Sequence, residues 1–133
     1  SYIAKALAYP ATQQGQKVLF TSAMDMINNL IFAEENKNLL RKLAYYQNPT
    51  LLVIDELGYL PLNEQGSNLL FQVISKRHGV KSTAITTNMV FKKWGNIFCN
   101  NTVAKAIADR LIHKSTIVLY DGPSYREKEA KQA

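Results

Sequence analysis

The chain has 133 residues, enough for one domain with its own core and too few for two ordinary domains. Hydrophobic residues make up 47% of it, which argues against disorder, and no apolar run approaches the ~20 residues that a membrane-spanning helix needs. The net charge of +6 suits contact with nucleic acid or another polyanion, and the single cysteine excludes an internal disulfide and fits a reducing cytoplasm.

The first part of the chain is predicted to run helix, strand, helix. Residues 1–9 carry apolar side chains at helical spacing, and Pro10 is expected to end this helix. A natural domain seldom begins in mid-helix without a cap, so we expect the chain to start inside a larger domain. Residues 17–21 have the pattern of a short buried strand. Ser22 is a good N-cap for a second helix that runs to about Asn36.

The middle of the chain contains the strongest strand signal. After a short helix at 39–46, four apolar residues at 51–54 run unbroken into Asp55 and Glu56. Such a run is typical of a strand buried on both faces of a parallel sheet, and ligands of open parallel sheets bind at the carboxyl end of the strands. Because adjacent strand residues point to opposite faces, we expect the two carboxylates to do different jobs.

The second half continues to alternate helices with strands, beginning with a turn at 58–61 and a helix that Asn63 caps and Gly79 follows. This alternation predicts an α/β fold, a parallel sheet with helices on both faces. The remaining predicted elements are a strand at 82–87 ending at Asn88, a helical turn or two around 91–98, a helix from Thr102, a strand at 115–120 and a charged tail at 124–133.

Several side chains in this half allow more than one interpretation. The pair Lys92–Lys93 beside Trp94 can contact DNA, although a tryptophan at this helical spacing is more often part of the core. Cys99 is expected to be a small packing residue. His78 and His113 lie near helix ends without other ligands at suitable spacing, so we do not expect them to bind a metal.

The apolar run that ends in Asp55 and Glu56 resembles a Walker B motif, in which the aspartate holds the Mg²⁺ that accompanies the nucleotide phosphates. Together with further motifs, it resembles the IstB-like ATP-binding proteins over essentially the whole chain. These are ATPase helpers of insertion-sequence transposases, of the AAA+ class of P-loop NTPases, and are similar to DnaC-type helicase loaders. The motifs are Leu51–Pro61 (LLVIDELGYLP), Asn68–Phe71, Thr86–Asn88, Trp94–Gly95, Ala108–Leu111 and Ser124–Arg126.

The sequence departs from this family at its start. Members carry a phosphate loop, G-x-x-x-x-G-K-[ST], before the first helix, and its backbone N–H groups and lysine cradle the phosphates. Ser1 matches the last position of that motif, whose hydroxyl ligates Mg²⁺, but the glycines and the lysine are absent. We therefore expect residues 1–133 to be a single partial AAA+ domain that lacks the first strand and the phosphate loop. As an isolated fragment it is expected to bind ATP weakly or not at all.

The resemblance implies roles for residues at the carboxyl end of the sheet. Asp55 and Ser1 would bind Mg²⁺ and thereby ATP, and Glu56 would orient or deprotonate the attacking water. The alternative is that the two acids are merely solvated at a strand end. Asn88 matches a sensor position whose amide contacts the γ-phosphate or the water, and its alternative is a turn-forming asparagine.

Two arginines complete the implied site. Arg110 resembles an arginine finger that one subunit offers to the nucleotide of its neighbour, and its alternative is a surface ion pair. Arg126 resembles a sensor arginine that reaches the phosphates within its own subunit, and its alternative is an ordinary residue of the charged tail. These roles imply a homo-oligomer with nucleotide at the subunit interfaces.

The sequence favours an ATP-dependent transposition helper, whose partners would be DNA and a transposase, because Glu56–Pro61 and Trp94–Gly95 look closest to that group. One alternative is a DnaC-type loader that acts on the replicative helicase. The other is a non-enzymatic remnant that binds DNA or partners through charge and exposed sheet edges. The resemblance also implies that strand 51–55 lies between strands 82–87 and 17–21.

Overall fold

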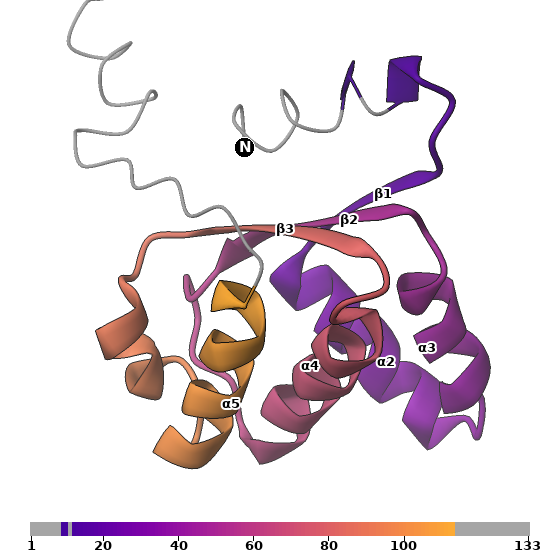
Figure 1. The fold of residues 1–133 in the computed structure, drawn as a ribbon. Helices are drawn as coiled ribbons and strands as arrows, with labels where there is room; N and C mark the ends of the chain where they lie inside the picture. The colour runs from indigo at the N-terminus through magenta and orange to yellow at the C-terminus, as the bar shows by residue number, and fades with distance from the viewer. Residues whose placement is uncertain (1–8, 11, 114–133) are drawn as a thin grey trace, which may run out of the picture.

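The computed structural model describes residues 9–10 and 12–113. They form a parallel sheet of three strands, β1 (Val18–Ser22), β2 (Leu51–Leu57) and β3 (Ser82–Thr87), in the order β1-β2-β3 (Figure 1). The strand order implied by the family resemblance is thus confirmed. The strand predicted at 115–120, the tail, Ser1 and Arg126 lie outside the described residues.

The helices also follow the predicted order, and the four described α-helices lie on one side of the sheet (Figure 1). Residues 9–10 and 12–13 are helical too, and Pro10 does not end this helix as predicted, since its carbonyl accepts a hydrogen bond from Gln14 N at 3.1 Å. Proline has a helix-compatible φ and its carbonyl can still accept a helical hydrogen bond, so helical backbone can follow it. The longer helical elements are α2 (Ala23–Glu35), α3 (Leu39–Gln47), α4 (Glu64–Arg77), the 3₁₀ helix η1 (Phe91–Asn96) and α5 (Asn101–Ile112).

Side-chain caps explain where three of the helices begin. The predicted cap Ser22 accepts a hydrogen bond from Asp25 N at 3.1 Å, and the predicted cap Asn63 accepts one from Gly66 N at 2.8 Å. Asn100 accepts from Val103 N at 2.7 Å, so α5 begins one residue before the predicted Thr102. These side-chain acceptors satisfy N–H groups that the first turn of a helix leaves unpaired.

The centre of β2 is the least exposed part of the sheet, with Leu52, Val53 and Ile54 at 0% exposure. The continuous apolar run therefore marks a strand covered on both faces, as predicted. Trp94 is also buried, and its indole N–H donates to the Met89 carbonyl at 3.1 Å, which confirms that it belongs to the core. The core is completed by the apolar faces of the helices, including Met26, Ile27, Leu30, Leu43, Leu69, Leu70, Val73, Ile74, Ile97, Phe98 and Ile107.

Cys99 is exposed, so the prediction that it is a packing residue was wrong. The two preceding residues, Ile97 and Phe98, occupy the buried positions at the end of η1. Cys99 lies directly before Asn100, the cap of α5.

A buried guanidinium connects the segments at the starts of β2 and β3. Arg77, 1% exposed at the end of α4, donates hydrogen bonds to the carbonyls of Tyr46, Gln47, Pro49 and Ser82 at 2.6–3.1 Å and to the Thr83 hydroxyl at 2.9 Å. Burial lowers the pKa of Arg77 to about 10, so the group remains a cation at neutral pH. It joins the end of α3 to the starts of β2 and β3.

Candidate functional site

The carboxyl ends of β2 and β3 bring an acidic pair together with a threonine. Asp55 is only 4% exposed, and the Thr86 hydroxyl on the neighbouring strand donates a hydrogen bond to its Oδ1. The same hydroxyl oxygen accepts a hydrogen bond from the backbone N–H of Glu56 at 2.9 Å. Thr86 therefore positions both acids relative to β3.

Glu56 has an unusual backbone conformation, with φ at +64° although it is not a glycine. The pairing of β2 with β3 shifts register between Ile54 and Leu57, which marks an irregularity at this point. The regular alternation that predicted opposite faces for the two acids is thus interrupted by a bulge. Their environments still differ, because Asp55 is buried whereas Glu56 is half-buried. Positive φ at a residue with a side chain is strained and is concentrated at functional sites.

The loop that follows is anchored close behind Glu56. Gly58 has φ at +92°, which strains any residue with a β-carbon, and a β-carbon added there would also lie 2.8 Å from Ile97 Cδ1. Leu62 N donates to the Ile97 carbonyl at 2.7 Å, which fixes the far end of the loop. Between these anchors, Tyr59 and Leu60 are exposed.

Asn88 lies at the same edge of the sheet as the acidic pair. It directly follows β3, whose last residue, Thr87, pairs with Leu57. Its side chain is exposed, and the turn is formed by its neighbours, since Met89 N donates to Thr87 Oγ1 at 3.1 Å. The structure thus brings Asn88 to the edge where Asp55 and Glu56 lie.

Arg110 lies on α5 and contacts α4. Its Nη1 donates to the Ala106 carbonyl at 3.1 Å, and its Cζ lies 4.7 Å from the centre of the Phe71 ring on α4. This cation–π contact contributes to its half-buried position. Ser1 and Arg126, the other two predicted ligands, lie outside the described residues.

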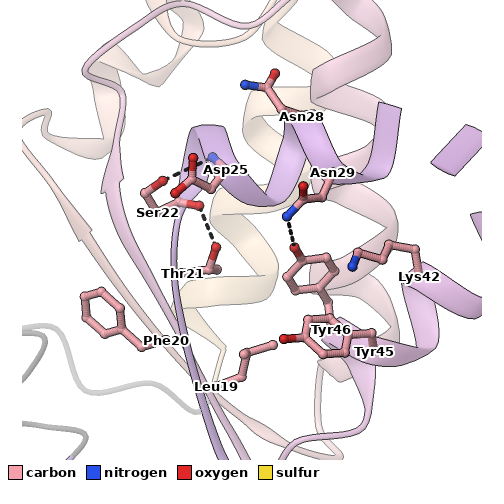
Figure 2. Close-up of a pocket in the computed structure, with 10 residues that line it drawn as sticks. All are labelled: Leu19, Phe20, Thr21, Ser22, Asp25, Asn28, Asn29, Lys42, Tyr45 and Tyr46. Atoms are coloured by element: carbon pink, nitrogen blue, oxygen red, sulfur yellow. Dashed lines mark hydrogen bonds between the residues drawn. The ribbon is translucent and has the colours of Figure 1, made fainter. Parts of the chain in front are cut away.

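A cavity of about 420 Å³ lies between β1, α2 and α3 (Figure 2). Inside it, Asn29 Nδ2 donates to Tyr46 Oη at 3.0 Å, and burial raises the pKa of the Tyr46 phenol. Of the predicted site residues that the structure describes, none lines this cavity, so it is separate from the acidic pair. Its lining residues are Leu19, Phe20, Thr21, Ser22, Asp25, Asn28, Asn29, Lys42, Tyr45 and Tyr46.

The acidic pair is chemically suited to Mg²⁺. Among the residues that the structure describes, no group of three or more His, Cys, Asp or Glu side chains is placed to hold a metal ion. Mg²⁺ bound with a nucleotide does not need such a group, because one or two carboxylates suffice when phosphate and water oxygens fill the other positions. Asp55 offers a hard oxygen donor that Thr86 holds in place, so the residues present fit Mg²⁺.

The sequence interpretation missed Thr86. Thr86 belongs to a β-prone run, and threonine is common in strands for reasons unrelated to function. The available signal was a hydroxyl residue near the end of the strand predicted to neighbour the acidic one. A hydroxyl can both donate to a carboxylate and accept from an N–H, which Thr86 does here.

Comparison with known proteins agrees with the motifs. A family profile described as IstB-like ATP binding protein matches residues 1–133. The chain belongs to this family. It is 37% identical over 131 residues to a protein of Geobacillus stearothermophilus named as an ATP-binding protein of insertion sequence IS5376, covering 98% of this chain and 52% of that protein. A Pseudomonas aeruginosa protein named for insertion sequence IS21 is 36% identical over 133 residues, covering 100% of this chain and 50% of that protein.

This IstB-like chain therefore spans about half the length of the curated relatives it matches. Solved structures show what fold the described part has. A DNA replication initiation factor aligns with a TM-score of 0.67 at 14% identity, covering 80% of this chain and 33% of that one. A replication initiator DnaA bound to AMPPCP and single-stranded DNA aligns with a TM-score of 0.68 at 15% identity, covering 79% and 33%. The predicted α/β fold with a parallel sheet is confirmed, and in the described part of the chain the four longer helices, α2 to α5, lie on one face of that sheet.

None of the helices in the described part of the chain combines the length and the apolarity that crossing a lipid bilayer requires.

Proposed function

We propose that the protein to which this chain belongs hydrolyses ATP as a helper of an insertion-sequence transposase that acts on DNA. The observation that carries the proposal is the acidic pair at the carboxyl edge of the sheet, where Thr86 holds Asp55 and the backbone of Glu56 together. The family description and the names of the relatives, which are ATP-binding proteins of insertion sequences, support the same function.

Each acid has a distinct role in this proposal. Asp55 and the Ser1 hydroxyl would hold Mg²⁺ directly or through water, and the ion would supply positive charge beside the phosphates. Glu56 orients the attacking water and accepts its proton. Its side chain is half-buried and its φ is positive, which suits a group that contacts a water molecule rather than the core.

Three further residues are proposed to contact the nucleotide. Asn88 lies at the same edge as the acids and hydrogen-bonds the γ-phosphate or the water. Arg110, which lies on α5 with its guanidinium against Phe71, acts on the nucleotide of a neighbouring subunit. Arg126 reaches the phosphates within its own subunit. This arrangement requires a homo-oligomer.

The phosphate loop that cradles ATP in this class is not found in the 133 residues. We therefore assign ATP binding to the whole protein and expect residues 1–133 alone to bind ATP weakly. Isothermal titration of this fragment with ATP and Mg²⁺ tests that expectation, and micromolar affinity would contradict it.

The proposed partners are duplex DNA and the transposase of the same insertion sequence, in the cytoplasm. The net charge of +6 is compatible with DNA contact. A role as a loader of the replicative helicase is less well supported, because the relatives that cover this chain are named for insertion sequences. Co-purification of the full-length protein with transposase rather than with helicase distinguishes the two.

The test of the proposed chemistry is Glu56→Gln in the full-length protein. We expect nucleotide binding to persist and turnover to fall by about 10²-fold or more, because the amide cannot accept the proton. Glu64→Gln is the matched control, since Glu64 is an exposed residue in the first turn of α4. Equal turnover in the two variants would show that Glu56 does not activate water. Loss of nucleotide binding in Glu56→Gln would show that Glu56 contributes to binding rather than to the attack by water.

A further inference from the structure

We propose that His78 and His113 together form a binding site for a divalent cation of the zinc class. The two residues are 35 positions apart in the sequence, yet His78 Nε2 and His113 Nδ1 lie 3.3 Å from each other. Their ring centres are 5.2 Å apart, and the ring planes are inclined by 40°. They are the only histidines in the chain.

The two distances match those of imidazoles that share one tetrahedral metal ion. With Zn–N bonds of about 2.0–2.1 Å and tetrahedral angles, two ligand nitrogens lie about 3.3–3.4 Å apart. Each ring centre lies about 1.15 Å beyond its nitrogen, so the ring centres of such a pair lie about 5.2 Å apart. A linear N–H···N hydrogen bond with the same nitrogen separation would put the centres about 5.6 Å apart. The observed separation of 5.2 Å is thus closer to the value for two imidazoles on one ion than to the value for a linear hydrogen bond.

Both ligands are fixed at the ends of well-formed helices. His78 follows α4 and its N–H donates to the Ile74 carbonyl at 2.9 Å, while His113 follows α5 and its N–H donates to the Asp109 carbonyl at 3.2 Å. The partial negative charge of two helix C-termini favours a cation between them. A bound ion would therefore join the C-terminal ends of α4 and α5.

The donor set selects the kind of ion. Imidazole nitrogen suits zinc, copper and nickel, whereas magnesium and calcium prefer oxygen ligands. His113 is exposed and His78 is half-buried, so water can fill the other coordination positions. The site differs from the proposed Mg²⁺ site in ligands, in ion and in place, and its existence does not depend on ATP hydrolysis.

The test is a titration of metal-free, full-length protein with ZnCl₂ alone, buffered at about pH 8 so that protons compete little for the imidazoles. Calorimetry gives the stoichiometry, and ¹⁵N shifts of the histidine rings report which nitrogens bind the metal. We expect one zinc per subunit bound at His78 Nε2 and His113 Nδ1. We also expect a higher melting temperature with zinc, because only the folded chain brings the two rings together.

Three variants complete the test. His78→Asn and His113→Asn should each weaken this zinc binding by at least about 10-fold and abolish the zinc-dependent rise in melting temperature. Cys99→Ser should change neither, which controls for the exposed thiol. The proposal is overturned if wild-type protein shows no ring-nitrogen shifts at about 100 µM zinc, or if Cys99→Ser rather than the histidine variants loses the site. Magnesium added in excess should not displace the zinc.

Discussion

The backbone conformation of Glu56 leads to an unusual prediction about the relative stability of two variants. Glycine normally destabilises a strand relative to alanine, by roughly 0.5–1 kcal/mol. At Glu56 we expect the opposite order, so that Glu56→Gly is more stable than Glu56→Ala. Both variants remove the carboxylate, so the comparison isolates the backbone from the chemistry of the side chain.

The magnitude follows from φ at +64°. A residue with a β-carbon in this left-handed region is strained by about 1–2 kcal/mol, and glycine is not. Against this gain stands the larger conformational freedom that glycine has in the unfolded chain, about 0.5–1 kcal/mol. The net difference in the free energy of unfolding is therefore about 0–1.5 kcal/mol in favour of glycine, with a midpoint of about 0.7 kcal/mol. At that midpoint the melting temperatures differ by roughly 1–3 °C for a protein of about 150–250 residues.

The measurement is urea unfolding of the two variants in the full-length protein, followed by circular dichroism. Lys37 provides a matched control, because its φ is +55° at the end of α2, far from the acidic pair in sequence, and Asn38 N donates to the Ala33 carbonyl at 2.7 Å there. Lys37→Gly should likewise be more stable than Lys37→Ala, and neither should change ATP turnover. If Glu56→Ala proves as stable as Glu56→Gly while the Lys37 pair behaves as expected, the strained conformation at Glu56 is wrong.

Two further changes test how the sheet is held together. Thr86→Val keeps the shape of the side chain but leaves the buried Asp55 without the hydroxyl donor and the Glu56 N–H without its acceptor. We expect the free energy of unfolding to fall by about 2–4 kcal/mol. A loss no larger than that caused by Thr50→Val, at an exposed position, would refute the role of the hydroxyl. Arg77→Met leaves four buried or half-buried carbonyls without their donor, so we expect the free energy of unfolding to fall by about 3–5 kcal/mol in urea unfolding. Arg41→Met, on the exposed face of α3, is the control and should change that free energy by less than about 0.5 kcal/mol. Similar losses of stability in the two arginine variants would contradict the stabilising role of the Arg77 hydrogen bonds.

Much of the fold was predictable because local signals agree with the tertiary structure. The run at 51–54 lacks polar residues because both faces of β2 are covered, and Ser22 and Asn63 stand where a helix needs an acceptor. The order of the strands was implied only by the family resemblance. The pattern of apolar residues identifies a strand but does not show which strands lie beside it in the sheet.

Other features depend on packing or on backbone geometry that the sequence does not reveal. A positive φ is expected at glycine, and nothing in the residue type of Glu56 indicates one. Asn100, Asn101 and Thr102 are all acceptable caps, so the start of α5 was ambiguous by one residue. The contact between His78 and His113 arises because α4 packs beside α5, which no local pattern encodes.

The roles assigned to Asp55 and Glu56 remain the central proposal, and locating the metal tests them most directly. The measurement is a structure of the full-length protein bound to Mg²⁺ and a non-hydrolysable ATP analogue. We predict Mg²⁺ at about 2.0–2.1 Å from an Asp55 oxygen, or about 4 Å away through one water, with Glu56 facing the γ-phosphate. A metal more than about 8 Å from Asp55, or a nucleotide away from the carboxyl edge of β2, would contradict the account.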